Sequence, residues 1–198
     1  MPTRSTTLRS YYQSFKSASG IIAGIVVASP YISRVLPAGL GSYVFPPLGG
    51  VEEVARAALV AMALAATFGV YFWTSSSAAT EPRAVTVTLV VAAVLFLVYF
   101  GLHLRFVRRV DIPALGTGAY VSIGYERTAF AKANFDSASD EDLLRSRGLD
   151  DEQVRLLWTT SSLIVARLLL YVAYCLCVLT LVVAFSLGVV CDAQATHK

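Results

Sequence analysis

Charged residues are scarce in this sequence. They make up 15% of its 198 residues, whereas a soluble domain usually carries about 25%. The scarcity is uneven, because 17 of the 29 charged side chains lie between Arg105 and Thr160 and the other 142 residues share 12. Hydrophobic residues account for 56% of the chain. This composition predicts an integral membrane protein rather than a soluble domain.

Three long stretches contain no Asp, Glu, Lys or Arg at all, namely residues 57–73, 84–102 and 168–191. Pumps coupled to protons or sodium usually place ionisable groups in the middle of their spans, despite the energetic cost. The absence of such groups argues against an ion-coupled transporter. Three arginines are expected near the cytoplasmic ends of the spans, where a long side chain can snorkel to the headgroups; they are Arg34, Arg56 and Arg167.

Cysteine and histidine are too few and too scattered to suggest metal chemistry. Cys175, Cys177 and Cys191 lie on or beside one apolar segment, and residues two apart face different sides of a helix. His103 and His197 are remote from them in the chain. No serine has a histidine and an acid at a recognisable catalytic spacing. We therefore expect no enzymatic activity, no metal site and no cofactor.

The first twenty residues carry three basic side chains and no small-residue cleavage site, so we expect this terminus to be retained. Apolar side chains recur in it at helical spacing, at Leu8, Tyr11, Tyr12 and Phe15. The spacing predicts that residues 1–20 form a helix lying on the membrane surface. The alternative is a frayed polar tail.

The expected fold is an all-α integral membrane protein with four apolar helical segments. Residues 84–104 are 21 residues without a formal charge, roughly 31 Å as a helix against a hydrocarbon thickness of about 30 Å. The first segment contains Pro30 and precedes many Pro and Gly residues, so it is either a short kinked span or re-entrant. The expected divisions are 1–20 interfacial; 21–104 transmembrane, with segments about 20–36, 51–73 and 84–104; 105–160 cytoplasmic; 161–191 last span; and 192–198 tail.

Lys and Arg counts predict the orientation. Four spans with residues 105–160 inside put eleven basic residues inside and five outside. A re-entrant first segment with the N-terminus inside gives fourteen to two, whereas four spans with that terminus inside give five to eleven. Both favoured arrangements predict a cell inner (plasma) membrane protein whose charged segment is cytoplasmic.

Small residues recur every fourth position on two of the predicted helices. Such ridges let helix backbones approach closely in lipid, where packing drives association. The two helices are expected to pack through these faces, either within one chain or between copies, which favours a homo-oligomer. The residues are Gly20, Gly24 and Ala28, then Ala57, Ala61, Ala65 and Gly69.

The segment 105–160 is 56 residues long, a length at which an isolated core is marginal. We expect the preceding helix to continue through its arginines until Pro113, followed by a strand-like alternation over residues 120–125. Two helices should follow, one capped near Ser139 and one starting at Asp150. No stop signal follows Asp151, so one continuous helix is expected from there through the last span.

Basic residues and glycines in this segment suggest a binding site. The glycine spacing fits neither a P-loop nor a dinucleotide fingerprint, but amides at Gly116 and Gly118 could hold an anion, such as a nucleotide or a lipid headgroup. Membrane lipid is the expected partner, and a net charge of +3 gives no reason to expect binding to a nucleic-acid duplex. The candidate ligand- or headgroup-binding residues are Arg105, Arg108, Arg109, Arg127 and Lys132.

These features favour a homo-oligomeric pore-forming or membrane-perturbing effector gated by its cytoplasmic segment. The alternative is a non-conducting sensor or scaffold that recruits a soluble cytoplasmic partner through residues 105–160. The size, the span number and the insert before the last span resemble the small multi-pass membrane subunits of bacterial anti-phage systems, such as the four-helix effectors of cyclic-oligonucleotide signalling and the membrane subunit of Kiwa. That resemblance implies oligomers that answer infection by disturbing the membrane or engaging an effector partner, and it assigns no residue a role.

Overall fold

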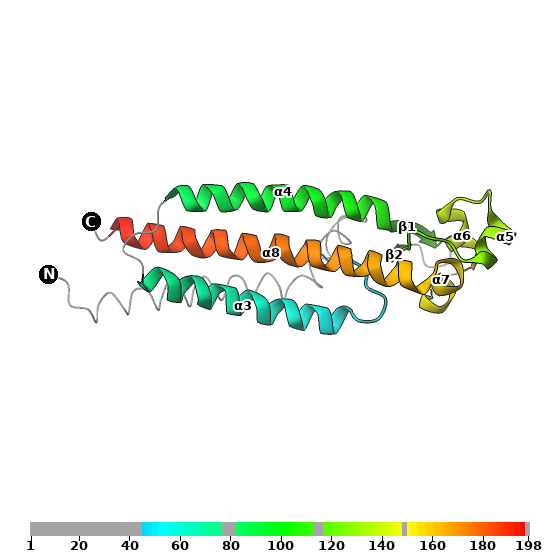
Figure 1. The fold of residues 1–198 in the computed structure, drawn as a ribbon, viewed down its shortest axis with the longest axis horizontal. Helices are drawn as coiled ribbons and strands as arrows, with labels where there is room; N and C mark the ends of the chain where they lie inside the picture. The colour runs from blue at the N-terminus through cyan, green and yellow to red at the C-terminus, as the bar shows by residue number, and fades with distance from the viewer. Residues whose placement is uncertain (1–44, 77–81, 113–116, 148–149, 197–198) are drawn as a thin grey trace. The chain divides into compact units, whose positions relative to one another are not determined.

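The computed structural model describes residues 45–76, 82–112, 117–147 and 150–196. The predicted segments 1–20 and 20–36, with Gly20, Gly24 and Ala28, lie outside the described residues. The described part of the chain is mostly helical, with one two-stranded sheet. In chain order the elements are α3 (Glu52–Ser76), α4 (Pro82–Phe106), β1 (Val107–Ile112), β2 (Thr117–Ser122), α5 (Ala129–Phe135), α6 (Asp140–Arg147), α7 (Asp151–Leu157) and α8 (Thr160–Thr196) (Figure 1).

Helices α3, α4 and α8 each contain a stretch long and apolar enough to cross a membrane, and these stretches are Glu52–Val70, Arg83–Phe106 and Thr160–Cys191. Pro82 opens α4, where its missing N–H costs nothing. Several hydroxyl groups inside these helices donate to the carbonyl four residues earlier, as Thr67 does to Ala63 at 2.8 Å, and so add no unsatisfied polar group. The prediction of a helical fold with three such segments is confirmed, and the three helices indicate a membrane location.

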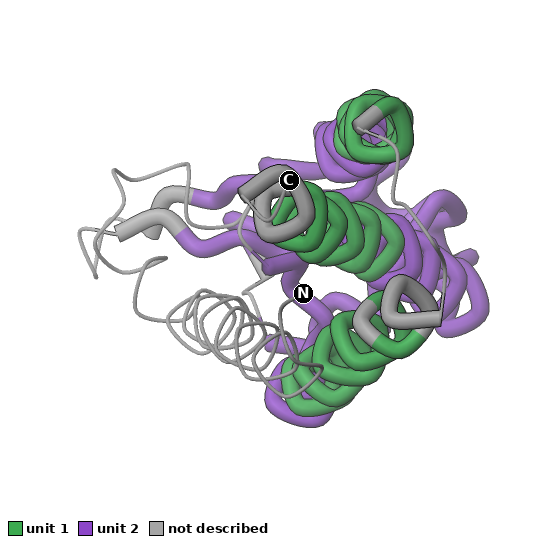
Figure 2. Tube along the Cα trace, turned by 90° about the vertical axis from the view of Figure 1, so that its left-hand side faces the viewer, with its two compact units in different colours: residues 1–28, 55–96, 175–198 green, residues 29–54, 97–174 purple. Residues whose placement is uncertain are grey.

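The chain divides into two compact units (Figure 2). The first contains the described residues 55–76, 82–96 and 175–196. Within it α8 contacts both other helices, because Ala63 of α3 packs with Val182 and the thiol of Cys177 donates to the Ala92 carbonyl of α4 at 4.0 Å. Large apolar side chains point outward, as expected for lipid-facing surfaces; they include Leu64, Phe68, Val90, Val94 and Phe185.

The second unit contains the described residues 45–54, 97–112, 117–147 and 150–174. Most of it is the segment between α4 and α8, residues 107–159, which we call the insert. The insert has a hydrophobic core to which α8 contributes one leucine, so it is more than a solvated linker. The core residues are Val110, Val121, Ile123, Ala131, Leu143, Leu144, Val154, Leu157, Trp158 and Leu163.

Strands β1 and β2 form an antiparallel hairpin whose register runs from Val107 opposite Ser122 to Ile112 opposite Thr117. The expectation that α4 continues through Arg108 and Arg109 to Pro113 is wrong, because α4 ends at Phe106. The β-branched residues of "VRRVDI" suit a strand. In that conformation Val110 enters the core of the insert, a long-range contact that outweighs local helix propensity.

Three short helices complete the insert. Thr128 caps α5, with its side-chain oxygen accepting from the Ala131 N–H at 3.1 Å. The predicted cap at Ser139 is confirmed, since its Oγ accepts from the Asp142 N–H at 3.2 Å. Helix α7 begins directly after Asp150, as expected, but the side chain of Asp150 makes no capping hydrogen bond. The sequence therefore located α6 and α7, and it missed α5.

The prediction of one unbroken helix from Asp151 through the last span is also wrong. Trp158 has an extended backbone between α7 and α8 and pairs with Arg127 in an isolated antiparallel bridge. The Thr128 N–H donates to the Leu157 carbonyl at 2.9 Å, and the Thr159 N–H donates to the Glu126 carbonyl at 3.0 Å. Backbone pairing with this distant segment replaces the helical hydrogen bonds that would continue α7 into α8.

Candidate functional site

Arg167 of α8 joins three elements of the second unit. Its side chain is only 15% exposed, although the surrounding helix is apolar. Nε donates to the Oγ of Ser122 at 2.9 Å, and Nη2 donates to Oδ1 of Asp151 at 2.5 Å. One guanidinium thereby ties α8 to the end of β2 and to the start of α7. We call Arg167, Asp151 and Ser122 the latch.

The chain entering α3 packs against the same guanidinium. Gly49 and Gly50 have positive φ angles of 65° and 91°, so three successive amides can turn toward one anion. Leu48 and Gly49 donate to Oε1 of Glu52, and Gly50 donates to Oε2, each at 3.1 Å. A Cβ atom added at Gly49 would overlap the guanidinium of Arg167. This position therefore requires glycine for both its backbone conformation and its close approach to the latch.

Asp151 is the acidic centre of the latch. Its Oδ2 lies 2.9 Å from Nη2 of Arg155, in addition to the contact with Arg167. Partial burial raises the pKa of Asp151, but the hydrogen bonds and charges of Arg167 and Arg155 outweigh it, so the pKa lies below 3.8. The carboxylate is therefore ionised at neutral pH, where it carries the charge that the pairing with Arg167 requires.

The sequence interpretation of Arg167 was wrong. It was expected to snorkel to headgroups, but its donors bond to Ser122 and Asp151. Asp151 lies sixteen residues away across a helix break and Ser122 lies forty-five residues away. No local spacing rule connects these positions, so only the tertiary fold reveals the pairing.

The structure separates the five predicted ligand-binding residues into two groups. Arg105 lies in the last turn of α4, and Arg108 and Arg109 follow it on β1. Arg127 lies deeper in the insert, where it donates to the Phe135 carbonyl at 3.2 Å and the Ala138 carbonyl at 3.0 Å. It also pairs with Asp140 at 2.7 Å. These bonds connect α5 to α6, so Arg127 stabilises the fold of the insert.

Lys132 is exposed on α5, with Nζ 3.8 Å from the carboxylate of Glu126. An exposed pair at this distance is weak, so Lys132 remains available to other anions. It is placed with the insert helices and not on the hairpin that carries Arg108 and Arg109. Gly116 lies outside the described residues, so the proposed role of its amide stays a prediction.

The small-residue ladder of α3 lies on the exposed side of that helix. Ala57, Ala61, Ala65 and Gly69 are all exposed. The side opposite to them holds Leu59, Ala63 and Val70, which are buried. The ladder therefore does not form the contact between α3 and α8 within this chain.

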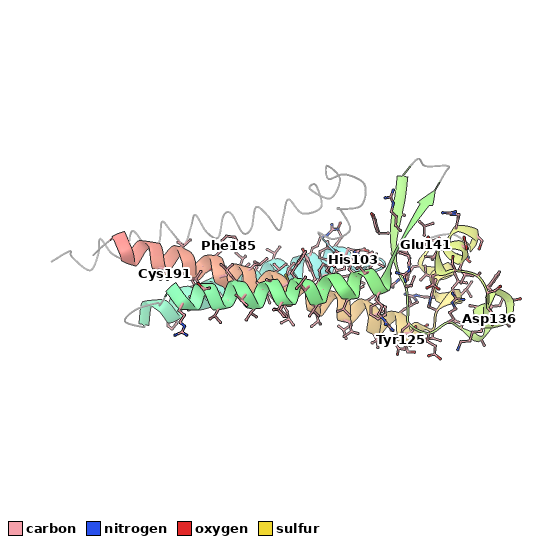
Figure 3. All side chains as sticks on the ribbon, turned by 90° about the horizontal axis from the view of Figure 1, so that it is seen from above. His103, Tyr125, Asp136, Glu141, Phe185 and Cys191 are labelled. Atoms are coloured by element: carbon pink, nitrogen blue, oxygen red, sulfur yellow. The ribbon has the colours of Figure 1, made fainter. Side chains whose placement is uncertain are left out.

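An aromatic cluster that the sequence interpretation missed lies at the insert end of α4. His103 is buried on α4 (Figure 3), and its ring centroid lies 5.9 Å from that of Tyr99. Tyr99 and Phe45 each approach Tyr174 of α8, with centroids 5.4 Å apart. The signal available in the sequence was the i,i+4 spacing of Tyr99 and His103 on an apolar helix.

Within the described residues, no group of three or more His, Cys, Asp or Glu side chains could hold a metal ion. The comparisons with known proteins add no relative: no family model matches this sequence, no curated protein matches it, and no solved structure matches its fold.

Proposed function

We propose that this protein is a homo-oligomeric membrane effector whose insert faces the cytoplasm and controls whether the assembled helices open or perturb the bilayer. The observation that carries the proposal is the latch, because a single charged side chain of α8 is bonded to both β2 and α7. A ligand or partner that moved α7 or β2 would act on Arg167 and thus on a helix long enough to cross the membrane.

The cytoplasmic orientation is supported by the charge distribution. Arg105, Arg108 and Arg109 follow the apolar part of α4 at once, and basic residues within a short distance of a span favour the inner side. They also complement the negative end of the α4 dipole. Access of a tag inserted near Asp136, which lies at the far end of the insert (Figure 3), from outside intact cells would contradict this orientation.

Assembly from several copies is supported by the exposed ladder on α3. Four small residues on one face leave room for another helix backbone at close range. The pair Ala61→Leu and Ala65→Leu should reduce the oligomer seen by mass photometry of the solubilised protein. Ala93→Leu is the matched control, since Ala93 is an exposed alanine of α4. Equal oligomer distributions for all variants would contradict assembly through the ladder.

Liposome leakage tests the effector activity. We expect liposomes that contain the wild-type protein, at a salt concentration like that of the cytoplasm, to release little dye until a ligand or partner binds the insert. Arg167→Met and Asp151→Asn break the same bond from opposite sides, so both should raise dye release severalfold. Retention of the dye by both variants, at a wild-type level of folded oligomer, would refute gating by the latch.

The second candidate is a non-conducting sensor or scaffold. Apolar side chains that remain exposed on the insert favour a partner surface there, namely Tyr125, Phe130 and Leu156. Purification from native membranes, with the variant Phe130→Ser as the comparison, separates the two candidates. A stoichiometric soluble partner lost in that variant, together with no leakage from any variant, would replace the effector proposal by the scaffold.

The likeness in layout to anti-phage membrane subunits extends the proposal to antiviral defence. The expected outcome is a lower plating efficiency of phage on cells that carry the gene, abolished by the ladder substitutions.

A further inference from the structure

The β1–β2 hairpin has two faces with different surroundings. On one face, Val107 and Tyr120 pack with residues of α4 and α8, and the Oγ of Ser122 accepts a hydrogen bond from Arg167 of α8. On the other face, Val110 and Val121 enter the core of the insert. The first face is therefore turned to the apolar helices, and the second is turned to the insert. We call the first the helix-side face.

Arg109 belongs to the helix-side face. It lies directly opposite Tyr120 in the register and two residues from Val107, and such residues share one side of a sheet. Its side chain is exposed. The hairpin leaves the end of α4 at a steep angle to the helix (Figure 3). If α4 crosses the bilayer, the helix-side face lies along the headgroup layer where the apolar stretch ends at Phe106.

Arg105 lies just before the hairpin in the chain. It is exposed in the last turn of α4, and its guanidinium carbon lies 5.7 Å from the centroid of the Phe106 ring. That distance is within the range of a cation–π contact, which places the guanidinium beside the ring that ends α4. The last turn of α4 and the hairpin that follows it thus carry two exposed arginines and a tyrosine, a residue enriched at membrane interfaces.

Arg108 lies on the other face of the hairpin. It is directly opposite Val121 on the insert side of the hairpin. Its Nη1 donates to the Leu104 carbonyl at 2.7 Å and approaches the Val107 carbonyl at 3.4 Å. Arg108 therefore binds a carbonyl left open at the C-terminal end of α4, as basic residues commonly do.

We propose that Arg105 and Arg109, with Tyr120 beside them, bind the phosphate of an anionic lipid headgroup, and that Arg108 takes no part in this site. Arginine suits the task because its planar guanidinium makes paired, charge-assisted hydrogen bonds to phosphate. Soluble phosphate esters carry the same group and could bind in the same way. We assign the site to a lipid because it lies at the end of an apolar helix that is long enough to cross a membrane. This proposal requires that α4 crosses a bilayer. It does not require that the protein conducts ions.

The test measures lipid binding by the full-length protein in detergent micelles. Phosphatidylglycerol and phosphatidylcholine are titrated separately, and bound lipids are counted by native mass spectrometry. Each arginine near a membrane surface contributes about fivefold in affinity, so Arg109→Gln should weaken phosphatidylglycerol binding about fivefold and Arg105→Gln with Arg109→Gln about thirtyfold. Arg108→Gln, the matched control, should change it less than about twofold.

Each outcome decides the proposal. Preference for phosphatidylglycerol that is lost in the Arg105 and Arg109 variants and kept in the Arg108 variant supports it. Equal losses in all three variants, or equal binding of both lipids, overturn it. Displacement of bound lipid by millimolar glycerol phosphate would show a soluble phosphate site and would overturn the assignment to lipid. Because leakage is not measured, failure here is separable from failure of the effector proposal.

Discussion

Helix α4 and the insert differ in what surrounds their apolar side chains. The outward side chains of α4 remain exposed within the chain, for example Leu97 at 67%. In the insert, Leu143, Leu144 and Trp158 are at most 1% exposed. In a bilayer, hydrocarbon tails can surround these side chains of α4, because the tails are as apolar as leucine. The insert must exclude water with its own side chains, so the two regions should respond differently to the same substitution.

The largest contrast is expected from Leu→Ala at matched sites. Leu144→Ala leaves a cavity in the core of the insert and should lower its free energy of unfolding by about 2–5 kcal/mol. Leu97→Ala removes a lipid-facing side chain and should cost less than about 1 kcal/mol. Hydrogen exchange of the α6 and β1 amides in nanodiscs measures both effects. Comparable protection in the two variants would mean that the insert has no independent core.

The second effect concerns the bonds that join the two regions. Arg167→Met leaves the carboxylate of Asp151 with Arg155 alone and leaves Ser122 without its donor. A charged, largely buried hydrogen-bonding group contributes about 1.5–3 kcal/mol, so unfolding of the insert should become easier by about that amount.

A double-mutant cycle with Asp151→Asn isolates the coupling between the two side chains. Thermal unfolding followed by the fluorescence of Trp158, in a Trp73→Phe background, is the measurement. Strictly additive losses would show that the pair in the latch contributes nothing beyond each residue alone.

A smaller effect is expected where the start of α5 meets the end of α7. Thr128 caps α5 and donates through Oγ1 to the Leu156 carbonyl at 2.6 Å. Thr128→Ala should cost about 1 kcal/mol and should increase exchange at Ala131 and Leu157. Thr88→Ala is the control, because Thr88 is a partly exposed residue of α4 whose hydroxyl donates to Ala84 within the same helix. No change of the insert is expected from it.

The smallest effect should come from pH. The folded-state pKa of Asp151 lies below its ordinary value of 3.8, so the carboxylate stabilises the fold above that pH and the contribution is lost as the pH falls through the folded-state pKa. Protection of α7 should be constant from pH 5 to pH 7 and should decrease below about pH 4. Asp151→Asn should remove that decrease. Loss of protection already at about pH 6 would point to a histidine instead.

The apolar helices and the short acidic helices could be predicted from the sequence. A long segment without charged residues can be recognised from its own composition, because it needs no distant partner to be stable as a helix in lipid. Helices α3, α4 and α8 could therefore be predicted from composition alone. The cap at Ser139 and the start of α7 after Asp150 follow from neighbouring residues. Helix α5 could also have been found, since Thr128 precedes apolar residues at helical spacing.

The tertiary structure alone decided that β1 replaces the end of a helix, that Trp158 interrupts the last helix, and that Arg167 bonds inside the protein. Each of these features depends on a partner many residues away. Strand β1 is stable only when it pairs with β2. Arg167 bonds inside the protein because the fold brings the carboxylate of Asp151 to it. The local periodicity of a sequence does not reveal partners that are distant in the chain. The sequence by itself therefore determined the apolar helices, whereas the tertiary fold of the insert determined how α4 and α8 connect to the insert.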